Sequence, residues 1–200
     1  MVAKVVCDCT ISLDGYMAGH NQSLEHPFGD IDRETLIAWM VRTPKEARTE
    51  SGMRTDIGAH IMGRNMFTPG RGEWDLDWRG WWGEEPPYHA PVFVLTHYAR
   101  DPLPMEGGTT FHFVTEGIES AMAQARAAAG DRDIAIAGGA TTINQYLAAG
   151  LLDELRIHRV PMVAGRGVRL FEGVPPFNLE AVSTQQAELV THTIFRIRHD

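Results

Sequence analysis

Residues 134–142, Ile-Ala-Ile-Ala-Gly-Gly-Ala-Thr-Thr, constrain the fold more than any other segment of this chain. The first four are small or β-branched and apolar, which is typical of a strand buried on both faces. The Gly138–Gly139 pair follows, and apolar residues then recur at helical spacing. A strand that runs through glycines into a helix points unpaired backbone N–H groups at one spot, where the helix dipole favours a phosphate. A plain strand–turn–helix connection is the alternative interpretation.

Composition limits the class of protein and its partners. The 200 residues, 44% hydrophobic and 22% charged, predict one soluble globular domain over residues 1–200. A net charge of −8 argues against nucleic acid as a partner, so an anionic ligand has to be held by local donors. No apolar run is long enough to cross a membrane, and the first residues carry no secretion signal. We therefore expect a cytoplasmic protein.

The cysteines and histidines do not predict a metal site. Cys7 and Cys9 are the only cysteines, and on a strand they share one face, a geometry that does not favour a disulfide between them. We expect both to be buried as small hydrophobic residues. None of the nine histidines lies at a spacing typical of a metal ligand set. His97 and His158 are therefore expected to be surface or hydrogen-bonded polar residues, and no metal is predicted.

The hydrophobic pattern predicts strands that alternate with helices, followed by a final hairpin. This order is typical of a three-layer α/β sandwich around a mixed, mostly parallel sheet that ends in an antiparallel hairpin. One strand alternates Leu155 and Ile157 with Arg156 and His158, which predicts one wetter face. The sheet of about eight strands comprises residues 4–11, 59–62, 91–95, 111–114, 134–137, 153–160, 178–186 and 188–198, with helices at 34–42, 118–129 and 141–149.

Two further predicted strands end in groups that suit a ligand. Gly63 and Arg64 follow one of them, and the arginine offers a planar fork for phosphate, with a plain surface charge as the alternative. Thr96 directly follows the other. Ligands of open α/β sheets bind outside the carboxyl ends of the strands, so these groups and the Gly138–Gly139 turn predict a dinucleotide laid across one edge. The first strand lacks the G-x-G-x-x-G sequence of a standard Rossmann fold.

Four motifs give the chain a resemblance to a known superfamily. They are Ser12-Leu13-Asp14-Gly15, Met62-Gly63-Arg64, Pro91 to Thr96, and Gly138 to Thr141. In their order and spacing the chain resembles the dihydrofolate-reductase-like superfamily, and most of all the C-terminal reductase domain of the bifunctional riboflavin-biosynthesis deaminase-reductase. Residues 151–155, 165–167 and 170–171 continue the match, which covers about residues 3–173. The resemblance implies a single mixed-sheet domain, NADPH as hydride donor, a small-molecule substrate and a homodimer.

The resemblance also implies roles in cofactor binding for individual residues. Gly63 and Arg64 are expected to meet the cofactor phosphates. Leu95 and Thr96 are expected to lie along the adenosine half. The pyrophosphate is expected at Gly138, Gly139, Ala140, Thr141 and Thr142.

The substrate side departs from the family pattern at two positions. Riboflavin-pathway reductases usually carry a glutamate immediately before the glycine pair, where this chain has Ala137. Dihydrofolate reductases use a helix carboxylate, and that position falls on Leu36 if Trp39 aligns with the tryptophan of the same helix. Leu36, Trp39 and Ala137 form the predicted substrate pocket. Asp14, the candidate catalytic residue, lies in a loop expected to close over nicotinamide and substrate, with a turn-capping role as the alternative.

Two functions therefore remain open. One is an NADPH-dependent reductase of a small heterocyclic or carbonyl substrate, for which the resemblance implies the riboflavin-pathway aminopyrimidine. The other is a non-catalytic nucleotide-binding dimer that kept the cofactor cleft and lost the substrate site, which Ala137 and Leu36 favour.

A cluster of tryptophans needs a place of burial. Trp74, Trp78, Trp81 and Trp82 lie within nine residues of a long Gly- and Pro-containing loop at 68–90. Such density has to be buried against the core, a partner subunit or a ligand. Packing or a dimer contact is one interpretation, and a lid over the substrate pocket is the other.

Overall fold

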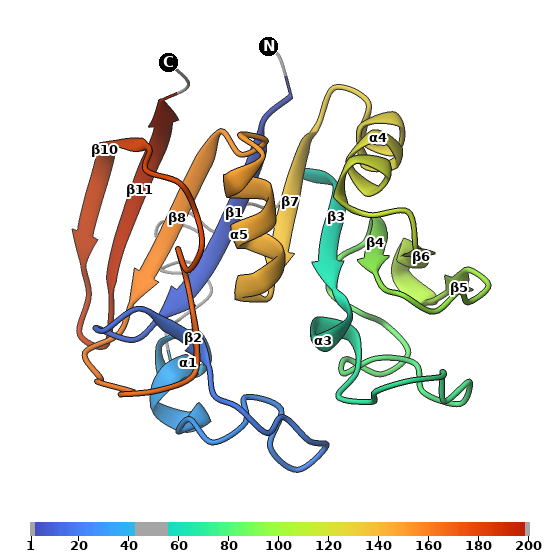
Figure 1. The fold of residues 1–200 in the computed structure, drawn as a ribbon, viewed down its shortest axis with the longest axis horizontal. Helices are drawn as coiled ribbons and strands as arrows, with labels where there is room; N and C mark the ends of the chain where they lie inside the picture. Colours follow the sequence, from blue (N-terminus) through green and yellow to red (C-terminus); the bar gives the residue numbers. More distant parts are fainter. Residues whose placement is uncertain (1–2, 43–55, 199–200) are drawn as a thin grey trace.

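The computed structural model describes residues 3–42 and 56–198, which are built around one large sheet (Figure 1). The described residues form the strands β1 (Val5–Ile11), β2 (Tyr16–Ala18), β3 (Ile57–Gly63), β4 (Pro91–Leu95), β5 (Leu103–Pro104), β6 (Thr110–Val114), β7 (Asp133–Gly138), β8 (Glu154–Arg159), β9 (Val168–Arg169), β10 (Asn178–Gln186) and β11 (Thr191–Arg198). The helices are α1 (Arg33–Arg42), α3 (Arg64–Phe67), α4 (Ile118–Ala129) and α5 (Ala140–Ala148). The large sheet has nine strands in the order β10-β11-β8-β1-β7-β3-β4-β6-β5, and β2 and β9 pair separately.

The sheet is mixed and mostly parallel, as expected. The central strands from β8 to β6 run parallel. The antiparallel β10–β11 hairpin extends one edge beside β8, and β5 pairs antiparallel with β6 at the other. The expected count of about eight strands agrees with the nine observed; the two-residue strand β5 is too short to show an alternating pattern in the sequence. β2, with three residues, and β9, with two, are likewise too short to be predicted.

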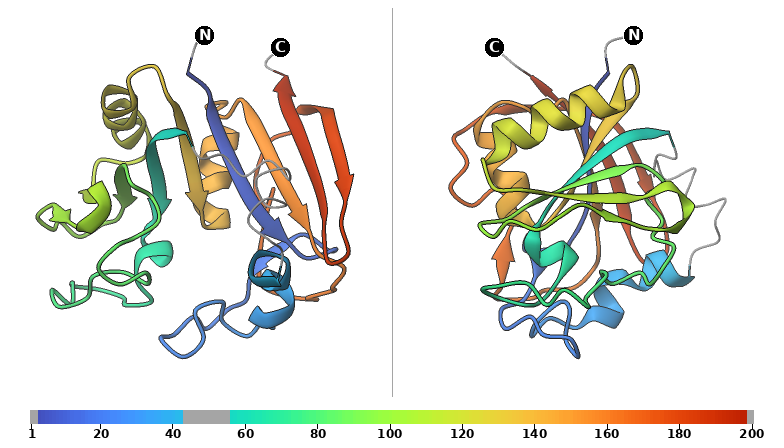
Figure 2. Two further views of the ribbon diagram at one scale, coloured as in Figure 1. Left: turned by 180° about the vertical axis from the view of Figure 1, so that it is seen from behind. Right: turned by 90° about the vertical axis from the view of Figure 1, so that its right-hand side faces the viewer.

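Helices lie on both sides of the sheet, with α4 and α5 along one face and α1 near the carboxyl end of β1 on the other (Figure 2). α4 and α5 lie on one face, where the main core includes Ile134 and Tyr146. α1 lies on the opposite face above a smaller core. The prediction for the cysteines is confirmed, since Cys7 and Cys9 are free, buried and part of the main core.

The sheet opens between its two middle strands. β1 pairs with β8 along Val6–Ile11, but it pairs with β7 only through Val5 and Val6. β7 continues its pairing with β3 as far as Gly138. The carboxyl ends of β1 and β7 are therefore not joined to each other, and the two strands separate as they approach that edge (Figure 2, left).

The prediction of a wetter face on β8 is wrong. Arg156 is 9% exposed and His158 is 3% exposed, so the strand is buried on both faces. The polar side chains are buried because each has a polar partner: Arg156 pairs with Glu154, and His158 bonds to His192. An alternation of apolar and polar residues predicts that one face of a strand is polar, but not that this face is exposed to solvent. On β8 the polar face is covered by neighbouring elements.

Candidate active site

Three of the predicted ligand-binding segments meet at one edge of the sheet. β7, β3 and β4 are adjacent and parallel, so their carboxyl ends lie side by side. In the register, Met62 stands opposite Gly138, and Gly63 stands opposite Leu95. The structure thus brings together the three segments that the sequence analysis assigned to one dinucleotide. We call this the cofactor edge.

The glycine pair shapes the centre of the cofactor edge. Gly138 has φ +121°, a conformation that side-chain-bearing residues rarely adopt, and the peptide bond to Gly139 is cis. Gly139 has φ −74°, and a Cβ added to it would meet no atom within 4 Å. Open space therefore lies beside Gly139. The adjoining first residues of α5, Ala140 and Thr141, have backbone N–H groups without an intrahelical acceptor.

Gly63 and Thr142 owe their identities to packing. A Cβ on Gly63 would overlap the Thr142 hydroxyl, so glycine is needed where the end of β3 approaches α5. Thr142 is buried and its side chain points at this contact. Both residues therefore set the shape of the edge, and their direct contact with a cofactor stays a prediction.

The far end of the cofactor edge carries two arginines on one indole ring. The Arg64 guanidinium lies 3.9 Å from the centre of the Trp74 ring, and that of Arg100 lies 5.5 Å from it. Arg64 Nε and Arg100 Nη1 are buried without a hydrogen-bond partner. Neither arginine forms an ion pair with another described residue. Burial lowers the pKa of both, yet guanidinium groups remain charged at neutral pH. The edge therefore presents local positive charge in an acidic chain.

The strand end at Leu95 and Thr96 supports these arginines. Thr96 is buried, and its hydroxyl accepts a hydrogen bond from the backbone N–H of Tyr98 (3.1 Å), which closes a tight turn. The turn places the Tyr98 ring 5.1 Å from the Arg64 guanidinium. The Thr96 hydroxyl is thus engaged in the turn, while Leu95 is half-buried beside the edge.

The loop at 68–90 contains no helix or strand, as expected, and its tryptophans divide into two groups. Trp74 and Trp78 pack on a third core cluster, which includes Phe67 and Phe111. They donate their indole N–H to the carbonyls of Tyr98 and Phe67, respectively, each at 2.8 Å. The packing interpretation is confirmed for these two. Trp82 is 58% exposed, so dimer contact and lid both stay open for it.

Both oxygens of Asp14 are engaged in hydrogen bonds, most of which join its turn to a distant loop. One carboxylate oxygen accepts hydrogen bonds from the Ser12 hydroxyl (2.7 Å) and the Ala164 N–H (3.0 Å), and the other accepts from the Gly165 N–H (2.7 Å). These bonds, that of Ser12 first, lower the pKa of Asp14 to about 2. The carboxylate is therefore ionised at neutral pH and cannot donate a proton to a substrate. Any other catalytic role for Asp14 stays a prediction. The turn itself is closed by Ser12, which accepts from the Gly15 N–H with its carbonyl and from the Tyr16 N–H with its hydroxyl, so a turn-capping role for Asp14 stays a prediction.

The predicted substrate pocket divides between core and edge. Leu36 and Trp39 are 0% and 1% exposed, and Trp39 donates its indole N–H to the Thr10 hydroxyl at 3.2 Å. These two residues fill the core beneath α1, so their placement in a pocket is not supported by this structure. Ala137 is half-buried on β7, beside the opening of the sheet.

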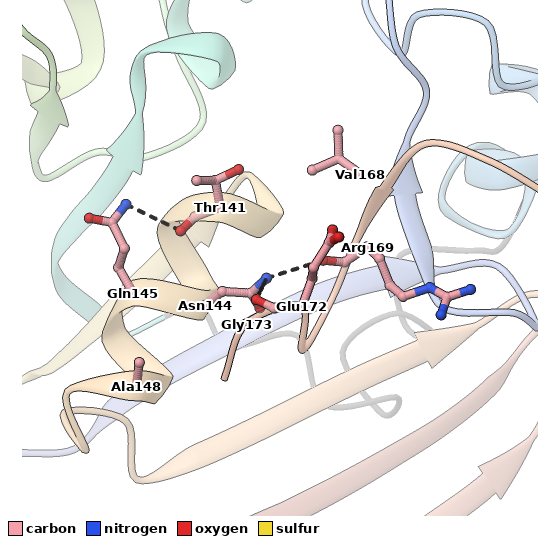
Figure 3. A pocket seen from close by; sticks show the side chains of 8 residues that line it. All are labelled: Thr141, Asn144, Gln145, Ala148, Val168, Arg169, Glu172 and Gly173. Carbon is pink, nitrogen blue, oxygen red and sulfur yellow. Dashed lines mark hydrogen bonds between the residues drawn. The ribbon is translucent and has the colours of Figure 1, made fainter. Parts of the chain in front are cut away.

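Two adjoining cavities lie beyond the cofactor edge. One, of about 290 Å³, separates the exposed side of α5 from the β9 segment and is lined by Thr141 and Arg169 (Figure 3). Asn144 closes its floor, since its amide donates to the carbonyls of Arg169 and Glu172 and accepts from the Phe171 N–H. A second cavity of about 360 Å³ shares Arg169 and continues toward β2. Thr141 thus faces this open space.

A buried histidine pair on the α1 face is the feature that the sequence analysis missed. His158 Nδ1 lies 2.7 Å from His192 Nδ1, and His158 Nε2 lies 3.4 Å from Asp8 Oδ1. The Trp39 ring packs on both imidazoles. Burial, followed by the charge of His158, lowers the pKa of His192 to about 4. His158 is hydrogen-bonded as predicted, but its partners on other strands left no local signal in the sequence.

Among the described residues, no three His, Cys, Asp or Glu side chains are grouped so as to hold a metal ion. The same part of the chain contains no helix with the length and apolar character needed to span a bilayer.

The mostly parallel sheet, its terminal hairpin and the glycine turn before α5 define a protein of the dihydrofolate-reductase-like fold. The RibD C-terminal domain family matches residues 3–192, and the chain belongs to this family. The resemblance inferred from the sequence motifs is confirmed.

Individual relatives agree with this assignment. The uncharacterized protein YyaP of Bacillus subtilis (strain 168) is 26% identical over 193 residues, which are 91% of this chain and 88% of YyaP. A candidate riboflavin biosynthesis protein from Shewanella sp. PV-4 has a TM-score of 0.61 and 24% identity, covering 98% of this chain and 99% of its own.

Two enzyme structures share the fold at lower identity. The diaminohydroxyphosphoribosylaminopyrimidine deaminase/5-amino-6-(5-phosphoribosylamino)uracil reductase of Thermotoga maritima has a TM-score of 0.59 and 14% identity, over 98% of this chain and 57% of that one. Dihydrofolate reductase from Enterococcus faecalis, complexed with NADP(H), has a TM-score of 0.57 and 13% identity, over 98% of this chain and 97% of that one.

Proposed function

We propose that this protein is an NADPH-dependent reductase of a small heterocyclic substrate, pyrimidine- or pteridine-like, or of a carbonyl compound. The observation that carries the proposal is the cofactor edge. It joins open space beside Gly139 to two guanidinium groups that have unpartnered nitrogens.

The residues of the edge fit the two anionic parts of NADPH. The space beside Gly139 and the first N–H groups of α5 suit a pyrophosphate, because no side chain fills that space and the helix dipole favours negative charge. Arg64 and Arg100 suit the additional phosphate on the adenosine half, because their buried nitrogens have no acceptor within the described chain.

The remaining elements place the reaction beside the sheet opening. When bound, NADPH supplies the hydride, so the protein has to orient the substrate and exclude water. The separated ends of β1 and β7 border the cofactor edge, and they are the place that we propose for the substrate ring. Asp14 ties the turn after β1 to the loop at 160–165 and thereby fixes one wall of this opening.

The relatives support the class of reaction. The Thermotoga protein is named as a reductase of an aminopyrimidine, and the Enterococcus structure holds NADP(H). The riboflavin-pathway aminopyrimidine is accordingly the first substrate to test. Our proposal includes a cytoplasmic homodimer that acts on a small molecule and binds neither nucleic acid nor membrane.

A non-catalytic nucleotide-binding dimer is the competing function. It is favoured by the apolar residues Leu36 and Ala137 at positions where related reductases carry a carboxylate. Both functions predict that the protein binds NADPH, but only the reductase is expected to oxidise it in the presence of a substrate.

The test is NADPH titration of the purified protein, followed by NADPH oxidation with 5-amino-6-(5-phosphoribosylamino)uracil, dihydrofolate and a set of aldehydes and ketones. We expect NADPH binding, turnover of the aminopyrimidine and little turnover of dihydrofolate, because the α1 position for a pterin-binding carboxylate is Leu36. Failure to bind NADPH contradicts the reductase and its competitor alike. Binding without oxidation by any compound selects the competitor.

A further inference from the structure

Asp8 lies where the opening of the sheet meets the α1 face. It is two residues beyond Val6, the last residue of β1 that pairs with β7. Val6 pairs with Ala135, so Asp8 and Ala137 occupy equivalent positions on the two strands as they separate. Both belong to the face opposite the main core, since the alternate residues Cys7 and Ile136 are in that core. Asp8 therefore borders the site proposed for the substrate.

One oxygen of the Asp8 carboxylate is buried but has no hydrogen bond. Its Oδ1 is buried without a hydrogen bond, and the same holds for His158 Nε2, 3.4 Å away. The His158 side chain is 4% exposed, whereas the Asp8 side chain is 27% exposed, through its other atoms, which include Oδ2. Buried polar atoms are nearly always hydrogen-bonded, so two unpartnered atoms that face each other are unusual. The carboxylate is thus held from one side and accessible from the other.

The neighbouring charged groups are already committed. Arg156, directly opposite Asp8 in the register, has its Nη2 2.6 Å from Glu154 Oε1. Lys4 also contacts Glu154, at 3.3 Å. From the other elements packed here, α1 contributes the uncharged Trp39, and β11 contributes His192 behind His158. Asp14 accepts with both oxygens, as described above. Of these carboxylates, Asp8 is the one with an oxygen available to a ligand.

The histidine pair fixes the orientation of the ring that faces Asp8. A hydrogen bond between two Nδ1 atoms at 2.7 Å requires a hydrogen on one of them and a lone pair on the other. When His158 Nε2 carries a hydrogen toward Asp8, the neutral ring accepts at Nδ1, and His192 donates. The pair can carry at most one additional proton, because two cationic rings would place two hydrogens between the same nitrogens. The bond between the two Nδ1 atoms therefore holds the His158 ring in its rotamer, and the tautomer that donates toward Asp8 is the one in which His192 donates at Nδ1.

We infer that Asp8 is the substrate-contacting carboxylate of this reductase and that His158 and His192 are its positioning residues. This inference rests on the proposed function. The ligand class is a nitrogen heterocycle that carries N–H donors, since the accessible carboxylate oxygen of Asp8 can accept a charge-assisted hydrogen bond from a ring N–H or an exocyclic amino group. An aminopyrimidine has such donors, whereas a simple aldehyde or ketone does not.

The test uses 5,6-diaminouracil as the probe, titrated calorimetrically into the protein loaded with NADPH. Asp8→Asn is compared with Asp131→Asn, an exposed carboxylate between α4 and β7 at the opposite end of the sheet. We expect Asp8→Asn to weaken probe binding about tenfold to a hundredfold, as loss of a charged hydrogen-bond acceptor does. Asp131→Asn should bind the probe as the unsubstituted protein does, and NADPH affinity should be the same in all three.

The positioning role is tested through the pH profile of probe binding. His158→Gln keeps polar atoms at the site but removes the imidazole that faces Asp8 and bonds to His192, so the midpoint of the profile should move. Asp131→Asn should leave the midpoint in place. NADPH affinity reports whether His158→Gln is folded, and His192→Gln provides a second variant of the same pair. An unchanged midpoint in both histidine variants overturns the positioning role.

The assignment of Asp8 is overturned if the unsubstituted protein does not bind 5,6-diaminouracil, or if Asp8→Asn binds it equally well. Failure of the unsubstituted protein to bind NADPH instead refutes the proposed function. These two failures are measured with different ligands and are therefore distinguishable.

Discussion

The cofactor edge and the α1 face of the same sheet differ in how their chemistry is built. At the cofactor edge, glycines and backbone N–H groups at adjacent strand ends create the open space, and two arginines stack on one indole. On the α1 face, Asp8, His158 and His192 come from three different strands and meet only through side chains. Backbone chemistry leaves a motif in the sequence, whereas side-chain chemistry across strands does not.

The two regions also differ in the sign of their unpartnered groups. The cofactor edge has buried guanidinium nitrogens without acceptors, and the α1 face has a partly exposed carboxylate, Asp8, whose buried oxygen faces His158 Nε2 without a hydrogen bond. One region is suited to phosphate and the other to N–H groups. Our predictions alter one region and use the other as the control.

The largest effect is expected from Gly139→Val. The side chain would fill the open space proposed for the pyrophosphate, so NADPH binding should weaken by about a thousandfold, ~4 kcal/mol. Calorimetric titration measures this loss. Thermal unfolding should change little, because a Cβ on Gly139 touches no atom within 4 Å.

Gly138→Ala is the matched contrast, since φ +121° at Gly138 strains any residue with a side chain and should lower stability. Asp8→Asn should leave NADPH affinity unaltered. If Gly139→Val binds NADPH normally, the phosphate position is wrong.

Acid should destabilise the α1 face through His192 and the middle of β3 through His60. Burial lowers the pKa of His60, which lies beside Tyr88 of the loop at 68–90, to about 4, and that of His192 likewise. The unfolded chain, with histidine pKa values near 6.5, binds more protons between pH 6.5 and 4. Stability is therefore fully present above pH 6.5 and falls toward pH 4, by up to about 3 kcal/mol for each group.

Denaturant unfolding across this pH range measures the effect. His60→Gln and His192→Gln should each flatten the pH dependence. The exposed His97→Gln should not. Equal slopes for all three variants would falsify the assignment of acid sensitivity to the two buried rings.

Arg64→Ala should lower NADPH affinity about tenfold to a hundredfold, roughly 1.5–3 kcal/mol, and change NADH affinity little. The reason is the additional phosphate of NADPH, which Arg64 and Arg100 are positioned to pair. Titrations with both cofactors measure the preference. The control is Arg71→Ala, because Arg71 is an exposed arginine of the loop at 68–90 and bonds to the Pro69 carbonyl. An unchanged preference in Arg64→Ala contradicts this placement of the adenosine half.

The smallest effect concerns Trp82. Because its indole is 58% exposed while Trp78 is hydrogen-bonded and packed, Trp82 is free to contact a ligand or a second subunit. Tryptophan emission should change on NADPH addition or on dilution, and Trp82→Phe should remove most of that change. Emission that responds to neither treatment leaves the loop with a packing role alone.

The elements with a strong local pattern were predictable to the residue. The strand Pro91–Leu95 and the helix Ile118–Ala129 have the expected bounds, because a continuous apolar run and a regular helical spacing mark their ends. The two-residue strands β5 and β9 have no such pattern and form only because a neighbouring segment supplies hydrogen-bond partners.

The sequence by itself determined the cofactor edge: a glycine pair before a helix, an arginine after a glycine, and parallel strands whose carboxyl ends must share one side. Only the tertiary structure decided which polar residues meet on the other face. It buried Leu36 and Trp39, bonded Asp14 to the loop at 160–165, and placed Asp8 against His158. The physical reason is the separation in sequence of the residues involved. Backbone geometry at a turn is set by a few adjacent residues, whereas a contact between side chains depends on the register of strands that are distant in the chain.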